Sequence, residues 1–206
     1  MPILEYFRND RVIKKLFFIH IPRTAGRYIT YWFFRNGFDV FYNEYDDKRN
    51  GGYELPHLWH PYYNVLPIED AVHFTIVRNP VDRFKSAIKE YIFYNNLEED
   101  YFNDISYEKL VDVIVDETTN TKSSFYIPQF NFVTDKTLVW KYEDGLDDTF
   151  KRWVYNNMGI KLKPTEKSYD KEEWDDGSIH PVLSLKTEEM IREYYKEDYK
   201  VFNYKN

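Results

Sequence analysis

The sequence contains no cysteine, so disulfides, thiolate metal ligands and a cysteine nucleophile are excluded. It also lacks long apolar runs, and we therefore expect no segment that spans a membrane. The first ten residues do not combine a basic start with a long apolar run, so no signal peptide is expected. These absences lead us to expect a cytoplasmic protein.

Aromatic residues, by contrast, are abundant. Of 206 residues, 20 are Tyr and 16 are Phe, a composition that argues against global disorder and predicts an aromatic core. A chain of this length is typical of one domain and can bury a sizeable core, so we expect a single domain over residues 1–206.

Charge is unevenly distributed along the chain. The net charge is −7, yet residues 1–36 carry seven basic and two acidic residues, whereas residues 95–120 carry one basic and eight acidic ones. A protein that coats nucleic acid needs a basic surface overall, so no nucleic-acid partner is expected. A small anionic ligand needs only a local basic pocket, which the N-terminal region is expected to supply.

The pattern of apolar residues predicts an α/β fold. Short apolar runs indicate buried strands at residues 16–21, 72–77 and 138–141. Helices are expected at residues 27–36, from residue 80 to about 95, and at 107–116, 146–157 and 187–195. Because strands alternate with helices, we expect a three-layer parallel sheet flanked by helices on both faces.

The first candidate site is the turn between the first predicted strand and helix, with the sequence Pro-Arg-Thr-Ala-Gly at residues 22–26. A glycine there lets the backbone approach a phosphate, and Arg23 and Arg27 add positive charge. The pattern GxxxxGK[ST] of ATP- and GTP-binding P-loops is absent. The same residues also fit an ordinary strand-to-helix turn with two surface arginines.

The second candidate site follows the second predicted strand and reads VRNPVDRFKSA. Arg78 closes the strand, and Ser86 lies two helical turns further on. Arginine binds phosphate in a bidentate manner, and serine adds one hydrogen bond. Alternatively, Asn79 caps the helix while Arg83 and Asp82 form a surface pair.

Together the two motifs resemble the PAPS-dependent sulfotransferases, where PAPS is 3′-phosphoadenosine-5′-phosphosulfate. The closest likeness is to the carbohydrate branch, which includes heparan sulfate 2-O- and chondroitin-type enzymes. Segments at residues 128–144 and 194–204 are also similar, so the resemblance covers residues 16–204 in order. It implies a P-loop-kinase-like sulfotransferase fold, PAPS as donor, PAP as product, and a hydroxylated acceptor that is a carbohydrate.

The resemblance also implies which residues bind the donor. The first motif is expected to bind the 5′-phosphosulfate through Arg23, Thr24, Ala25, Gly26, Arg27 and Tyr28. The second motif is expected to bind the 3′-phosphate through Arg78 and Ser86. The chain departs from the family at three of these positions, because Arg23 replaces the usual lysine and Arg27 and Tyr28 replace small hydroxyl residues.

Catalytic roles follow in the same way. Arg23 is expected to stabilise charge on the leaving phosphate oxygen. A histidine between the motifs is expected to take the acceptor's proton, with His60 preferred over His57.

The remaining histidines are assigned to structure: His20 and His73 to buried strands, and His180 to a C-terminal loop. The aromatic residues next to His60 either stack on a sugar ring or pack in the core; they are Trp59, Tyr62 and Tyr63.

No metal is expected in the reaction, since the donor's charge can be met by Arg23, Arg78 and main-chain N–H groups. The acidic runs at residues 97–104 and 170–176 lack the spacing of a calcium loop. Two rival functions remain open. One is a nucleotide or small-molecule kinase on a related fold, although the sequence lacks the Lys-Ser/Thr pair. The other is a module that binds PAP without catalysis.

Overall fold

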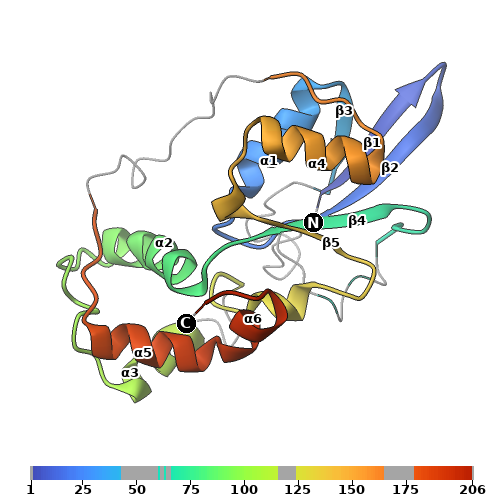
Figure 1. Ribbon diagram of the computed structural model, residues 1–206. Coiled ribbons are helices and arrows are strands. Elements are labelled where there is room, and N and C mark those ends of the chain that lie inside the picture. Colours follow the sequence, from blue (N-terminus) through green and yellow to red (C-terminus); the bar gives the residue numbers. More distant parts are fainter. Residues whose placement is uncertain are drawn as a thin grey trace. The chain divides into compact units, whose positions relative to one another are not determined.

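The chain forms two compact units in a computed structural model, which describes residues 2–42, 60, 63, 66–115, 124–164 and 179–205 (Figure 1). Unit 1 comprises Met1–Val77 and Asn131–Tyr169, and unit 2 comprises Arg78–Phe130 and Asp170–Asn206. The single domain over residues 1–206 stays a prediction.

Unit 1 contains a five-stranded sheet in the order β3-β1-β2-β4-β5. The strands are β1 (Ile3–Arg8), β2 (Arg11–Ile19), β3 (Phe38–Phe41), β4 (Val72–Val77) and β5 (Leu138–Lys141). Strands β2, β4 and β5 are parallel, but β1 is antiparallel to both β2 and β3. The three predicted strands are thus parallel, as expected, but the sheet as a whole is mixed because it includes the unpredicted β1.

The reason for the mixed sheet is the tight turn between β1 and β2. Asn9 and Asp10 both have positive φ, at 52° and 58°, as in the two-residue turns that join antiparallel strands. A parallel neighbour would need a long crossover, which two residues cannot provide.

Two helices, α1 (Gly26–Arg35) and α4 (Asp148–Met158), pack against one face of this sheet. Alternate strand residues point to that face, and the helices cover them with aromatic rings. The ring centroids of Phe33 in α1 and Phe74 in β4 are 5.5 Å apart, and those of Trp32 in α1 and Phe150 in α4 are also 5.5 Å apart. The helical layer on the other face stays a prediction.

Local signals explain where these two helices begin and end. Gly37 follows α1 at φ 85°, and Gly159 caps α4 at φ 70°, a conformation that glycine adopts without strain. At its start, α4 is capped by Asp147, whose carboxylate accepts from the Thr149 N–H at 2.8 Å.

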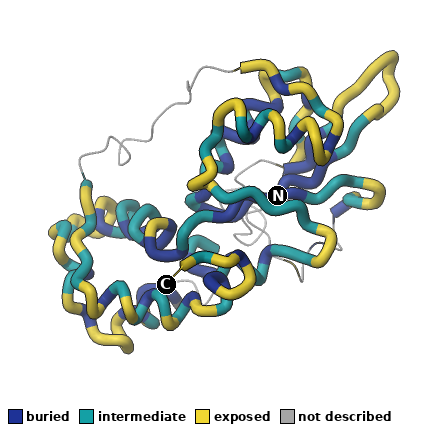
Figure 2. Tube along the Cα trace, in the orientation of Figure 1, coloured by how far each residue is buried: buried dark blue, intermediate teal, exposed yellow. Residues whose placement is uncertain are grey.

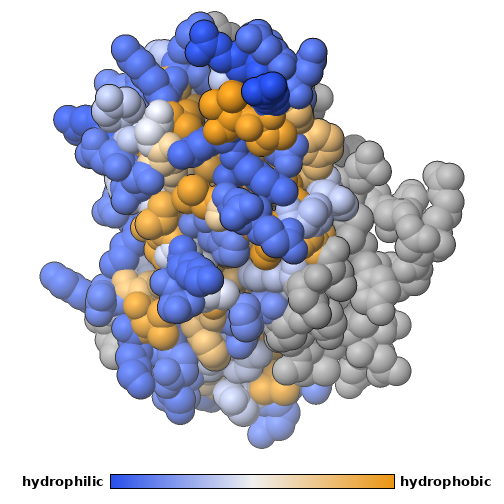
Figure 3. Space-filling model, turned by 90° about the vertical axis from the view of Figure 1, so that its right-hand side faces the viewer, coloured by the Kyte–Doolittle hydropathy of each residue, from blue (hydrophilic) through white to orange (hydrophobic). Residues whose placement is uncertain are grey.

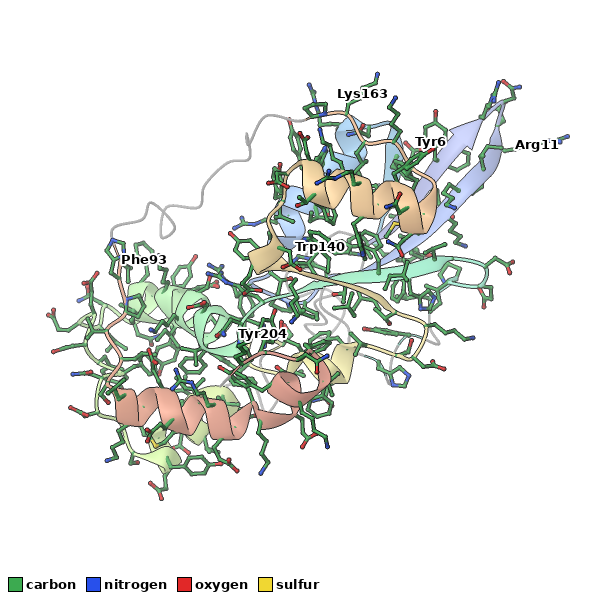
Figure 4. The ribbon with its side chains drawn as sticks, in the orientation of Figure 1. Tyr6, Arg11, Phe93, Trp140, Lys163 and Tyr204 are labelled. Atoms are coloured by element: carbon green, nitrogen blue, oxygen red, sulfur yellow. The ribbon has the colours of Figure 1, made fainter. Side chains whose placement is uncertain are left out.

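The basic residues near the N-terminus do not all lie near the first predicted motif. Arg8 and Arg11 are exposed at the turn of the β1–β2 hairpin, where Figure 4 labels Arg11. Since a strand rises about 3.3 Å per residue, Arg11 lies about 26 Å along β2 from Ile19, where the strand ends. Figure 2 shows this far end as exposed and the inner part of β2 as buried. Only Arg23 and Arg27 of the basic N-terminal segment border the predicted phosphate loop.

Unit 2 is helical. Its helices are α2 (Pro80–Tyr94), α3 (Tyr107–Val115), α5 (Leu185–Tyr194) and α6 (Lys196–Val201). Their shared core includes Phe84, Phe102, Leu110 and Ile191. Asn79 caps α2 by accepting from the Val81 N–H at 3.0 Å, as predicted.

Most of the predicted elements are present. The predicted strands at residues 72–77 and 138–141 coincide with β4 and β5, and the predicted helices differ from the observed ones by two residues or fewer at each end. The short strands β1 and β3 and the final helix α6 were not predicted.

Among the residues described, no helix combines the length and apolar character that crossing a membrane requires. On the face drawn in Figure 3, hydrophobic residues lie in separate groups between hydrophilic ones.

Candidate functional site

The first predicted motif lies at the carboxyl end of the parallel strands. Strands β2 and β4 are neighbours, with Ile19 opposite Thr75, so the chain leaves both strands at the same edge of the sheet. The Thr75 hydroxyl donates to the Ile19 carbonyl at 2.7 Å and ties the two strand ends together. Ligands of α/β proteins bind at this edge.

The loop between β2 and α1 has an unusual backbone. Arg23 and Ala25 both adopt positive φ, at 68° and 71°, although neither is glycine. Such conformations carry strain for side-chain-bearing residues and concentrate at functional sites. Left-handed residues that alternate with other conformations turn main-chain N–H groups toward an anion in phosphate-binding loops.

Close packing explains the glycine of this motif. A Cβ atom built on Gly26 would lie 1.8 Å from the ring of His20, far inside van der Waals contact. His20 is only 4% exposed and stacks on Phe18, with 5.7 Å between ring centroids. Its assignment to the core is confirmed, and position 26 admits no side chain.

Helix α1 begins without a capping side chain. Ala25 is its N-cap and makes no side-chain hydrogen bond, and the first turn contains no acidic residue. In contrast, Asn79, Asp147 and Ser184 cap α2, α4 and α5 with their side chains. The start of α1 carries the partial positive charge of a helix N-terminus and can take a bound anion as its cap.

The side chains of the loop divide into two groups. Thr24 is fully buried and its hydroxyl donates to the Ile21 carbonyl at 2.8 Å, while the Tyr28 ring is 7% exposed and packs 5.4 Å from Trp32. These two positions can therefore offer a ligand their main chain. Arg23 and Arg27 are half-buried and supply the positive charge.

The second predicted motif begins in unit 2, directly after β4. Arg78 is half-buried, and its main chain is held by Gln129 through two reciprocal bonds. The Arg78 N–H donates to Gln129 Oε1 at 2.9 Å, and Gln129 Nε2 donates to the Arg78 carbonyl at 2.8 Å. The role of Gln129 was not predicted, although it lies in a segment that resembles the family.

Two further residues of this motif lie on α2. Ser86 is half-buried in the second turn of the helix. Arg83 is only 1% exposed, so its interpretation as part of a surface pair with Asp82 is wrong. It is buried because its guanidinium reaches the carbonyls of Phe125 and Ile127.

The proposed base is described only in part. His57 lies outside the described residues, as do Trp59 and Tyr62. His60 is exposed, and its ring lies 5.8 Å from that of Tyr63 at 84°. Exposure leaves the His60 imidazole accessible to a substrate.

Tyr63 itself belongs to the core rather than to a sugar platform. It is 5% exposed, its ring packs 5.0 Å from Phe17, and its hydroxyl donates to the Phe132 carbonyl at 2.6 Å. Burial raises the pKa of the Tyr63 phenol above its usual value, so this hydroxyl keeps its proton.

The other two histidines have structural surroundings. His73 in β4 is half-buried with its ring 5.1 Å from Phe17, and burial lowers its pKa. His180 is exposed, and its main-chain N–H donates to the Glu99 carboxylate.

Within the described part of the chain, no group of three acidic or histidine side chains is placed to hold a metal ion. That the reaction needs no metal stays a prediction.

Comparison with known proteins identifies the family. A family model described as "Sulfotransferase family" matches residues 5–205, nearly the whole chain. The chain therefore belongs to the sulfotransferase family. Neither the curated proteins nor the solved structures that were compared gave a match.

The close approach of His20 and Gly26 yields a test. We expect Gly26→Ala to destabilise the protein by about 1–3 kcal/mol, the usual cost of overpacking a close-packed site. Thermal unfolding measures this loss.

The control is the double variant His20→Ala/Gly26→Ala, in which the added methyl meets no ring. It should be less unstable than the sum of the two single variants predicts, because the clash is absent. Additive losses would show that the two residues do not collide.

Proposed function

We propose that the protein transfers a sulfuryl group from PAPS to an acceptor hydroxyl. The observation that carries this proposal is the loop at residues 22–26. In a chain of the sulfotransferase family, a strained loop enters a helix that lacks a side-chain cap, at the sheet edge where α/β proteins bind ligands.

The donor's 5′-phosphosulfate is assigned to this loop. Main-chain N–H groups from Thr24 to Tyr28 bind its oxygens, and Arg23 and Arg27 add charge. This assignment tolerates the departure at Tyr28, because that ring packs into the core while its N–H stays in the first turn of α1. The departure at Arg23 preserves a cation that does not lose its proton.

The 3′-phosphate is assigned to Arg78 and Ser86. A guanidinium forms bidentate bonds with phosphate, and the serine hydroxyl donates one more. The overall charge of the chain is −7, so recognition of an anionic donor depends on such local cations.

The reaction is an in-line displacement at sulfur. The acceptor oxygen bonds to sulfur while the bond between sulfur and the 5′-phosphate oxygen breaks. The acceptor's proton passes to His60 or His57, and the leaving phosphate of PAP takes the electron pair. Arg23 stabilises the negative charge that develops on that oxygen, and the loop holds the reacting atoms in line.

The acceptor class we propose is a neutral or lightly charged carbohydrate. The support is the resemblance of both motifs to the branch that sulfates sugars. An acidic chain would repel a densely sulfated polymer.

The kinase alternative is less well supported by the loop. Gly26 is followed by Arg27 and Tyr28 rather than by the Lys-Ser/Thr pair that holds nucleotide phosphates and magnesium in P-loop enzymes. The second alternative, a module that binds PAP without catalysis, differs from the proposal only in turnover.

Donor recognition is tested by ligand-induced stabilisation. We expect PAP to raise the melting temperature more than ATP at equal concentration, because ATP lacks the 3′-phosphate that Arg78 and Ser86 are proposed to read. Equal shifts from the two nucleotides would contradict this assignment.

The proposed residues should differ in which kinetic constant they control. Arg78→Ala is expected to weaken PAP binding by about 10- to 100-fold, because the loss of one hydrogen bond to a charged group changes the binding free energy by that amount. Arg23→Ala is expected to lower kcat by about 100-fold or more, because its contact strengthens in the transition state. Titration calorimetry and steady-state kinetics separate the two effects.

The same measurements identify the base. His60→Ala should lower kcat by about 100-fold or more while PAP affinity stays near normal, and His57→Ala is the matched comparison. Full activity in both variants would place the base elsewhere.

Acceptor class is tested by turnover. The protein is given labelled PAPS with a panel of glycans, phenols and tyrosyl peptides. We expect label on glycans and release of PAP. Transfer to phenols or peptides alone would refute the carbohydrate acceptor but keep the transferase, and no transfer to any acceptor would favour the binding module.

A further inference from the structure

Arg83, Tyr195 and Asp198 hold the segment at residues 125–130 from three sides within unit 2. Arg83 reaches this segment from α2, Tyr195 from the junction of α5 and α6, and Asp198 from α6. All three are 2% exposed or less. The segment is therefore fixed by buried polar contacts rather than by a sheet.

Arg83 holds the first part of the segment. Its guanidinium donates to the Ile127 carbonyl at 3.0 Å and to the Phe125 carbonyl at 2.8 Å. Burial lowers the pKa of Arg83, and the phenol of Tyr195 and the carboxyl of Asp198 oppose this effect. A buried guanidinium needs such acceptors, because the desolvation of an unpartnered charge is costly.

Asp198 holds the other end. One carboxylate oxygen accepts from the Gln129 N–H at 2.9 Å, and the other accepts from the Phe130 N–H at 2.8 Å. Burial raises the pKa of Asp198, whereas these two hydrogen bonds lower it. Between the ends, the Tyr195 hydroxyl donates to the Tyr126 carbonyl at 2.9 Å.

The segment at residues 125–130 places the Gln129 side chain against the main chain of Arg78. Gln129 is fully buried, and its amide satisfies both the N–H and the carbonyl of Arg78. Its Nε2 also lies 3.4 Å from Asp198 Oδ2, which fixes the orientation of the amide. The position at which the Arg78 side chain leaves the backbone thus depends on Gln129 and, through it, on Asp198.

We propose that Gln129 and Asp198 are positioning residues for recognition of the donor's 3′-phosphate. This inference rests on the proposed function, in which Arg78 binds that phosphate. A bidentate contact needs the guanidinium plane in one orientation, and a main chain clamped at both polar atoms restricts that orientation before the ligand arrives. Neither residue touches the donor; both act through the backbone of Arg78.

The test measures selectivity rather than affinity alone. Titration calorimetry on the full chain gives the dissociation constants of PAP and of AMP, which lacks only the 3′-phosphate. We expect the wild type to prefer PAP. Gln129→Ala and Asp198→Asn should each reduce that preference about tenfold, the worth of one buried hydrogen bond to a charged group.

The asparagine substitution is chosen for its chemistry. It keeps the size of Asp198, but its amide nitrogen places a donor against one of the two N–H groups that the carboxylate accepts from. Amide hydrogen exchange at Arg78 provides a second measurement that needs no ligand. It should become faster in both variants, because the N–H loses or loosens its bond to Gln129.

Thr187→Ala is the matched control. Thr187 is also buried in unit 2; its hydroxyl donates to the Asn103 carbonyl at 2.6 Å, and its other side-chain hydrogen bond is with Ser184 rather than with the segment at residues 125–130. This variant should lose stability and keep the preference for PAP.

The outcomes separate the two levels of the proposal. If Arg78→Ala reduces the preference while Gln129→Ala and Asp198→Asn retain it, the donor site holds and the positioning role is refuted. Faster exchange at Arg78 with an unchanged preference would also refute it. A wild type that binds PAP and AMP equally would overturn the donor assignment together with this inference.

Discussion

The contact between the His20 ring and the main chain of Gly26 is the constraint on which the loop of unit 1 depends. The ring lies where any side chain at position 26 would have to go. It therefore fixes how closely the start of α1 approaches the end of β2, and the six residues between them must turn within that space. Positive φ at Arg23 and Ala25 is the backbone's response to this short connection. The strain is held by the hydrogen bonds of Thr24 and Thr75 on either side.

Local patterns were enough to predict the inner strands and most helix ends. Strands β4 and β5 are short apolar runs bounded by polar residues, and Gly37 and Gly159 mark helix ends through their backbone freedom. Strand β1 escaped prediction because its outer half is exposed on a hairpin and carries no clean alternation. The turn residues Asn9 and Asp10 were the available signal, and they are a weaker one than Asn-Gly.

The candidate site residues stay a prediction, but the structure shows that the surroundings of some of their side chains were not foreseen. Arg83 was paired with Asp82 because the two residues are adjacent and opposite in charge, although neighbours in sequence do not face each other on a helix. Its actual partners are carbonyls more than forty residues later, and only the fold brings them near. The same holds for Tyr28, whose ring enters the core of unit 1 although the motif suggested a ligand contact. A local sequence motif does not show which side chains contact residues that are distant in the sequence.

The clamp on Arg78 has a consequence for how the protein is made. Its last member, Asp198, follows Arg78 by about 120 residues, so the ribosome needs on the order of ten seconds to add it at roughly 5–20 residues per second. In the loop of residues 22–26, by contrast, the Thr24 hydroxyl donates to a carbonyl only three residues earlier in the chain. These contacts of the two candidate motifs can therefore form at different times in a nascent chain. The contacts around Arg78 are complete only when α6 has been synthesised and has folded against Gln129.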